Sequence, residues 1–320
     1  MDFKETKAYS LIKEFILMIN NSVKDEKQCP LEGDNILSEI KQIILSTPLS
    51  EHKGRYANPG MVNVIEAIEK ITDNPYLRNS FGNKIRMDFG TGHELNFLCY
   101  LYCCFKDVKD KLGLNELEGN IEQADINDSS LNDNHKNNTN VDDAEACSAK
   151  LRSQSEKQEG TDENTAPGNQ EHLGDSIHQI STDQVQKPSN IRNHPEISIS
   201  KINQVSGILR EYFNIIRLYI QKFNVEAAGS RGCWSIDDFL LLPYLFGSAE
   251  NFNDPRPIDC IGTGIFREAY NLNNSIMVKD LCKLSWPSIN VGMYKLYVEE
   301  VLVRHVVTQH FIYTKFLPQK

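Results

Sequence analysis

The chain is 320 residues long and 40% hydrophobic, which is enough for one large folded core or two smaller ones. Its formal charge is -10, but the segment from Glu118 to Pro195 holds 15 acidic and 6 basic residues, a net of 6 - 15 = -9. The rest of the chain carries -10 - (-9) = -1 and shows no basic stripe of the kind that binds nucleic acid. No run of about 18 apolar residues occurs, so we expect no membrane span.

The eight cysteines indicate a reducing compartment rather than a metal site. None of them forms a C-x-x-C pair, and no spacing of Cys and His is typical of zinc. The N-terminal residues carry charges of both signs and are not followed by an apolar stretch, so we expect no signal peptide. Together these features predict a soluble, intracellular protein.

Apolar residues recur at helical spacing along the first third of the chain. This periodicity predicts amphipathic helices over residues 8–24, 34–46 and 61–71. A longer apolar helix is expected from Leu95 to Phe105, where the three cysteines behave as small hydrophobic residues.

The second half of the chain has the same character. The apolar pattern after Ile197 predicts a helix of about six turns. Further helices are expected from Ser235 to Pro243, within 257–283, and from Pro287 to Arg304. Because we find no alternation typical of a strand ladder, the sequence predicts an all-α fold with more than eight helices.

The central segment differs from both flanks in composition. From Lys106 to Glu211 there is no aromatic residue, and Asn, Asp, Ser, Gln and Glu dominate. Such a stretch buries too little apolar surface to offset the entropy of ordering it. We therefore predict a disordered acidic insertion over 118–195, which interrupts one compact domain formed by residues 1–117 and 196–320.

A glycine-rich stretch from Phe81 to Glu94 precedes the apolar helix. Thr91 and Glu94 have the spacing of a capping box, in which the two side chains bond each other's backbone N–H groups. A helix that starts after glycines leaves N–H groups that suit a phosphate or carboxylate, and Arg86 adds a forked positive charge. The alternative interpretation is a well-capped helix that binds nothing.

A second glycine-rich loop runs from Gly229 to Asp238 and leads into the helix expected at Ser235. Asp88, Asp237 and Asp238 are the candidate metal ligands, because carboxylates are hard oxygen ligands for Mg²⁺. The spacing of a Walker A loop is absent, as are the kinase signature and a serine nucleophile elbow. His93 is interpreted as a packing residue, since neighbours one apart on a helix point in different directions.

Several motifs in one order resemble the phosphotyrosyl phosphatase activator family, whose members activate type 2A serine/threonine phosphatases. The resemblance covers nearly all of the chain outside 118–195. Its motifs are Arg55-Tyr-x-Asn58, Gly82-Asn-x-x-Arg86-x-Asp88-x-Gly90-Thr-Gly-His-Glu94, Glu226-x-Ala228-Gly-Ser-x-Gly232-x-Trp234-x-x-Asp237-Asp-Phe239, Phe246-Gly-Ser248, Ser285-Trp286, Asn290-x-Gly292 and Gln309-His310-Phe311.

The resemblance implies a compact all-α fold with a deep cleft that binds ATP and Mg²⁺. The residues that match the family's nucleotide contacts are Arg86, Thr91, Gly92, Gln309 and His310.

The residues that match its metal ligands are Gly232, through its carbonyl group, and Asp238. No catalytic residue is assigned.

The resemblance also implies a partner and an activity. The partner is the type 2A phosphatase catalytic subunit together with its scaffold subunit. The chain would help the catalytic subunit to acquire its active-site metals. The implied activity is peptidyl-prolyl isomerisation of a proline-containing peptide. The implied location of the protein is the cytoplasm and also the nucleus. The alternative is a helical interaction scaffold that has lost nucleotide binding and isomerase activity.

The sequence departs from the family pattern at three places. Val306 replaces a proline, and Lys84-Ile85 stand where small hydroxyl residues are usual. The stretch Arg267-Glu-Ala-Tyr270 occupies the place of a Lys-Thr-Gly-Pro-Phe element in the part of the family that faces partner and peptide. Phosphatase contact and isomerase activity are therefore less firmly implied than the fold.

Overall fold

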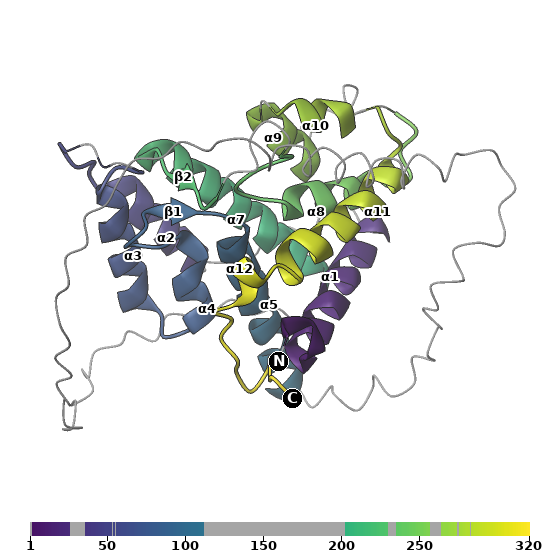
Figure 1. The fold of residues 1–320 in the computed structure, drawn as a ribbon, viewed down its shortest axis with the longest axis horizontal. Coiled ribbons are helices and arrows are strands. Elements are labelled where there is room, and N and C mark those ends of the chain that lie inside the picture. Colours follow the sequence, from purple (N-terminus) through teal and green to yellow (C-terminus); the bar gives the residue numbers. More distant parts are fainter. Residues whose placement is uncertain are drawn as a thin grey trace, which may run out of the picture.

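A computed structural model describes residues 2–25, 36–52, 54, 56–111, 202–229, 235–256, 264–273, 275–281 and 283–320. The predicted insertion at 118–195 lies outside these residues, as do Arg55 and Gly232. The described part is mainly helical, which confirms the predicted fold class (Figure 1). None of the described helices is both long and apolar enough to cross a membrane.

The N-terminal part contributes helices and one short strand. Its elements are η1 (Phe3–Glu5), α1 (Lys7–Asp25), α2 (Ile36–Ser46), α3 (Gly60–Ile71), α4 (Pro75–Arg78), η2 (Asn79–Phe81), β1 (Asp88–Phe89) and α5 (Thr91–Lys111). The bounds of α1, α2 and α3 agree with the predicted helices to within about two residues, whereas α5 extends beyond the predicted Leu95–Phe105 at both ends. The agreement arises because each of these three helices carries an apolar stripe that packs against the core.

The C-terminal part supplies the helices that complete the core. They are α7 (Ile202–Phe223), β2 (Glu226–Ala227), α8 (Leu242–Glu250), α9 (Ile265–Leu272), α10 (Ile276–Leu281), α11 (Trp286–Tyr297), the π-helical turn η6 (Val298–Leu302) and α12 (His305–Thr308). As predicted, α11 has Pro287 in its first turn. Ser285 caps it by accepting a bond from the Ser288 N–H group.

The core forms where the two longest helices, α5 and α7, meet α8. The rings of Phe97 on α5 and Tyr212 on α7 are stacked with centroids 3.7 Å apart. Residues Leu242 to Ala249 of α8 are all buried, and this helix packs against α1, α9 and α11. A helix that is apolar on all sides belongs in the interior, so α8 links the two halves of the chain.

One prediction about the fold is wrong, because the described residues include a short strand ladder. β1 and β2 pair in parallel, with Asp88 opposite Glu226 and Phe89 opposite Ala227 (Figure 1). A two-residue ladder leaves no alternation that a sequence pattern can reveal. Its effect is to bring Gly90 and Ala228, which directly follow the two strands, close together.

Candidate nucleotide and metal site

The first wall of the candidate site is the N-terminus of α5. The carbonyl group of Gly90 accepts bonds from the N–H groups of His93 and Glu94, at 2.9 and 3.3 Å. The N–H groups of Thr91 and Gly92 find no acceptor among the described residues. They therefore remain as donors at the positive end of a helix of 21 residues, an arrangement that suits an anion.

The second wall is the chain that leaves β2. The Ala228 N–H group donates to the carbonyl group of Phe89 at 2.7 Å. A Cβ atom on Gly90 would lie 3.1 Å from the Cβ atom of Ala228. This close approach leaves little room for a side chain at residue 90 and places Ala228 beside the start of α5.

The third wall comes from the C-terminal segment, where α12 lies against α5 (Figure 1). A Cβ atom on Gly92 would lie 3.5 Å from Val307 on α12. Gln309 and His310 follow α12 directly and are exposed. The structure thus brings the last predicted nucleotide residues to the same end of α5 as Thr91 and Gly92.

The C-terminal tail is held in place by aromatic residues from the start of the chain. The ring of Phe311 lies 4.6 Å from that of Phe3 and 6.1 Å from that of Tyr76, centroid to centroid. The Tyr76 hydroxyl group donates to the carbonyl group of Ile312 at 2.6 Å. These contacts determine the position of the third wall.

Arg86 lies in a tight loop whose backbone is bonded by Asn83. The Asn83 side chain accepts from the N–H groups of Ile85 and Arg86, and the Arg86 Nε atom donates to Asp88 at 2.9 Å. The Arg86 side chain is 59% exposed, so its guanidinium group retains access to solvent. Asp88 therefore pairs with Arg86, which makes it a poorer candidate for a metal ligand.

The predicted capping box is wrong, because Glu94 caps a different helix. Its side chain is fully buried and accepts bonds from the Leu241 N–H group at 3.1 Å and the Leu242 N–H group at 2.9 Å. Burial raises the pKa of Glu94 to about 8, against the lowering effect of these N–H groups. Glu94 thereby joins the start of α5 to the start of α8 across 147 residues of sequence.

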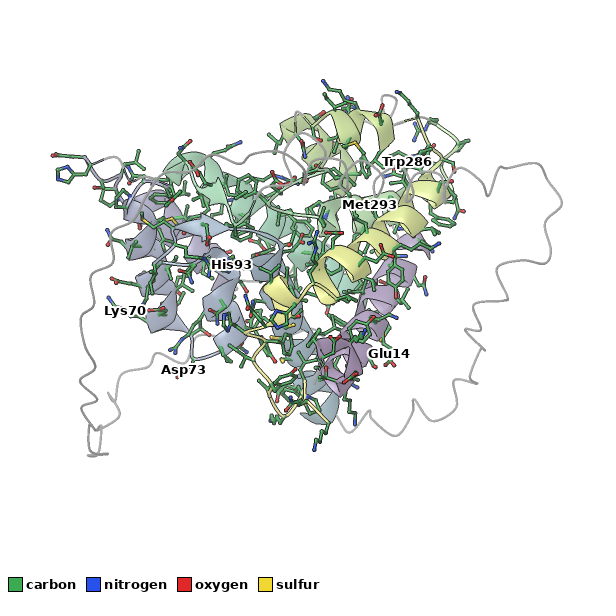
Figure 2. All side chains as sticks on the ribbon, in the orientation of Figure 1. Glu14, Lys70, Asp73, His93, Trp286 and Met293 are labelled. Atoms are coloured by element: carbon green, nitrogen blue, oxygen red, sulfur yellow. The ribbon has the colours of Figure 1, made fainter. Side chains whose placement is uncertain are left out.

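His93 packs as predicted and lies in the first turn of α5 (Figure 2). Its ring is stacked on Phe89 at 5.5 Å, and its Nδ1 atom lies 2.7 Å from the carbonyl oxygen of Asn79. Burial lowers the pKa of this imidazole.

The helix predicted from Ser235 to Pro243 is also wrong. Residues 235–241 are not helical, and α8 begins at Leu242, with Pro243 in its first turn rather than at its end. Asp237 shapes this segment, because its carboxylate accepts from the N–H groups of Phe239 and Leu240 at 2.8 and 3.2 Å. Such a turn competes with helix formation and explains the error. Burial raises the pKa of Asp237.

The candidate metal ligand Asp238 lines a cavity of about 300 Å³ together with Asp237. Carboxylates are suitable ligands for Mg²⁺, so these residues fit the ion that the resemblance implies. Within the described ranges no group of three His, Cys, Asp or Glu residues could hold a metal. A bound Mg²⁺ would thus need carbonyl, water or phosphate oxygens to complete its coordination.

Sequence reasoning missed two residues near these walls, Val307 and Arg217. Val307 approaches Gly92 only through the tertiary fold. Arg217 lines the cavity from α7, and a signal for it exists. It lies four residues after Phe213 and three before Ile220, so a charge interrupts the apolar stripe of a helix.

The fold and site define a class of helical proteins with glycine-rich loops gathered at the start of a buried helix. A sequence profile of the phosphotyrosyl phosphate activator (PTPA) protein family matches residues 64–112 and 191–274. The serine/threonine-protein phosphatase 2A activator of Encephalitozoon cuniculi is 32% identical over 322 residues, which cover 99% of this chain and 94% of that protein. The chain therefore belongs to the PTPA family.

One more distant sequence relative and one solved structure are also similar to this chain. The probable serine/threonine-protein phosphatase 2A activator 2 of Dictyostelium discoideum is 22% identical, and the alignment covers 98% of this chain and 62% of that protein. The crystal structure of the PP2A phosphatase activator Ypa1 PTPA1 superposes with a TM-score of 0.59 at 17% identity. That superposition covers 100% of this chain and 91% of the Ypa1 chain.

Proposed function

We propose that this protein is an activator of type 2A serine/threonine protein phosphatase that binds the phosphatase catalytic subunit. The observation that carries the proposal is the 32% identity, over almost the full length of both chains, to a relative named as a phosphatase 2A activator. The retained glycine-rich loops and the shared fold support it. The scaffold subunit of the phosphatase is a further proposed partner.

We propose that ATP and Mg²⁺ act together with the protein. The N–H groups of Thr91 and Gly92 would bind phosphate oxygens, and Arg86 would supply a charge-assisted bond. Gln309 and His310 would contact the nucleotide from the C-terminal side. The chemistry that Mg²⁺ supplies when bound is neutralisation of phosphate charge, and Asp238 with the Gly232 carbonyl group would hold it.

The role of these residues is to bind and orient rather than to react. Glu94 joins α5, which carries the phosphate donors, to the segment that carries Asp238. The two proposed binding groups are thus held by one buried contact. Binding at one wall then constrains the other, which is how a nucleotide would order a surface for a protein partner.

Reactivation of a metal-stripped type 2A catalytic subunit tests the activator function. We expect the protein to restore phosphatase activity when ATP and Mg²⁺ are both present. No restoration at saturating protein, with the catalytic subunit shown to be intact by reactivation with added metal alone, would contradict the proposal. A pull-down of the catalytic subunit with the full chain and with a chain lacking 118–195 tests the role of that segment.

Calorimetry of ATP binding tests the metal ligand. Asp238→Asn is expected to weaken Mg·ATP binding at least tenfold, about 1.4 kcal/mol, because the metal loses a charged ligand. Asp73→Asn is a matched control, since Asp73 pairs with Arg78 and lies at the lower edge of the molecule, away from His93 (Figure 2). Equal affinities of the two variants would remove Asp238 from the site.

We propose peptidyl-prolyl isomerase activity as the finer function. The cavity beside Asp238 has the apolar side chains Phe239, Leu240 and Leu272 in its lining, which suit a proline ring. A protease-coupled peptide assay tests it, with Leu240→Asp expected to lower the rate. If neither ATP binding nor isomerisation is detected while the phosphatase still binds, the interaction scaffold is the correct function.

The proposed location of the protein is the cytoplasm and also the nucleus. Imaging of the tagged protein tests this proposal.

A further inference from the structure

The cavity of about 300 Å³ has a polar floor that the proposed nucleotide contacts do not use. It lies between α7, the segment 235–240 and α9. Its lining includes Arg217, Gln221, Ser235, Asn273 and Ser275, in addition to the two aspartates and several apolar side chains.

Arg217 lines this cavity, and one of its hydrogen-bond donors is unused among the residues that the structure describes. Its Nη1 atom is buried and has no hydrogen-bond partner within the described part of the chain. A buried guanidinium nitrogen without an acceptor is costly, because its N–H groups have lost water without gaining a partner. Burial lowers the pKa of Arg217, while Asp237, Glu268 and Glu94 act in the opposite direction through their field.

A second unused polar group lies in the same lining. Ser235 is only 5% exposed, and its Oγ atom has no partner among the described residues. The backbone of Ser235 is held separately, since its carbonyl group accepts a bond from the Ser275 hydroxyl group. Ser235 thus brings a hydroxyl group without a described partner to the lining of the cavity on a fixed backbone.

We infer that Arg217 and Ser235 form a binding site for a single carboxylate group, carried by a small organic acid or by an acidic side chain of a polypeptide. A guanidinium group matches a planar carboxylate with parallel N–H bonds, and the serine hydroxyl group adds a donor. Asp237, Asp238 and Glu268 give the surroundings negative charge. That charge opposes a dianion such as phosphate about twice as strongly as a carboxylate with a single charge, which distinguishes this site from the phosphate donors on α5.

The inference is tested by NMR of the full chain with ¹⁵N-labelled arginine, in buffer with EDTA so that no metal bridges the carboxylate. The Nε–Hε signal of Arg217 is assigned as the one lost in Arg217→Met. The probes are acetate, the peptide acetyl-Ala-Ala-Glu-Ala-Ala-amide and its Gln counterpart, and inorganic phosphate. We expect acetate and the Glu peptide to shift this signal, and the Gln peptide to leave it unchanged.

The titrations with acetate and with the Glu peptide identify the source of the ligand. Binding of the Glu peptide at least tenfold tighter than acetate indicates a side chain of a polypeptide, and equal binding indicates a free small acid. Arg217→Lys is expected to weaken the binding of either carboxylate probe about tenfold, because lysine keeps the positive charge but lacks the two parallel N–H donors of the guanidinium group.

A stability measurement separates this role from a structural one. Arg210 is the matched control on the same helix, since it pairs with Glu250 at 2.7 Å. We expect Arg210→Met to lower the melting temperature more than Arg217→Met does, because of the two only Arg210 makes a direct ion pair within the described ranges. Three results would overturn the inference: a melting temperature in Arg217→Met as low as in Arg210→Met, equal shifts by the Glu and Gln peptides, or tighter binding of phosphate than of acetate.

Discussion

Glu94 is the residue whose role the tertiary structure changes most, and its burial makes stability depend on pH. Burial raises its pKa from the ordinary value of 4.5 to about 8 in the folded protein, so the folded state binds an extra proton between these limits. The contribution of Glu94 to the free energy of unfolding is therefore fully present below pH 4.5, and it is lost as the pH rises toward 8. The expected slope is about 1.4 kcal/mol per pH unit.

Urea unfolding at several pH values from 5 to 9 measures this effect. We expect Glu94→Gln to lose this slope relative to the wild type, because glutamine does not titrate. The exposed Glu66 on α3 offers a control in Glu66→Gln, which should keep the wild-type slope. Parallel curves for wild type and Glu94→Gln would show that Glu94 does not change protonation on folding.

At the scale of elements, two helical glycines have opposite consequences. A Cβ atom on Gly247 of α8 would lie 2.3 Å from the backbone nitrogen of Phe266 on α9, whereas nothing lies within 4 Å of one on Gly292 of α11. Gly247→Ala is therefore expected to destabilise the protein by about 1–3 kcal/mol through overpacking.

Gly292→Ala serves as the matched control and is expected to stabilise by about 0.5–1 kcal/mol, because alanine loses less backbone freedom on folding. Denaturant midpoints of the two variants provide the measurement. A Gly247→Ala variant as stable as Gly292→Ala would mean that α8 and α9 separate at little cost. The close packing of the two helices would then not determine the position of the cavity.

At the scale of the whole molecule, one buried pair of amides connects the two ends of the chain. The side chains of Asn20 on α1 and Asn290 on α11 bond each other at 2.9 and 3.0 Å, and Asn290 also bonds Ser248 and the carbonyl group of Leu245 on α8. Removing one member leaves buried polar atoms without partners.

We expect Asn290→Ala to destabilise the protein by about 3 kcal/mol, since it affects three partners at once. A double-mutant cycle with Asn20→Ala, followed by calorimetric melting, isolates the coupling between the two amides, expected at about 0.5–3 kcal/mol. Additive single effects would show that the pair does not hold the chain ends together.

Local patterns were sufficient to predict most helices. The apolar stripes of α1, α2, α3 and α7 are local features, because one helix face carries enough hydrophobic surface to specify both its type and its buried side. The capped start of α11 was predictable for the same reason, since Ser285 bonds a residue only three positions away.

The errors occurred where a side chain finds a distant partner. Glu94 has the spacing of a capping box, yet it caps α8, because a buried carboxylate gains more from α8 donors that lack other acceptors. Asp237 bonds its own following N–H groups and keeps 235–241 from being helical. The β1–β2 ladder is too short to leave a pattern.

The sequence by itself determined the helical fold class, the family resemblance and the residues proposed for the nucleotide. These depend on periodicity and motif order, which are properties of neighbouring residues. Only the tertiary structure decided that Gly90 meets Ala228, that Gly92 meets Val307, and that Arg217 and Ser235 share one cavity. Such contacts depend on how helices pack, because they join side chains whose separation along the chain carries no information about their distance in space.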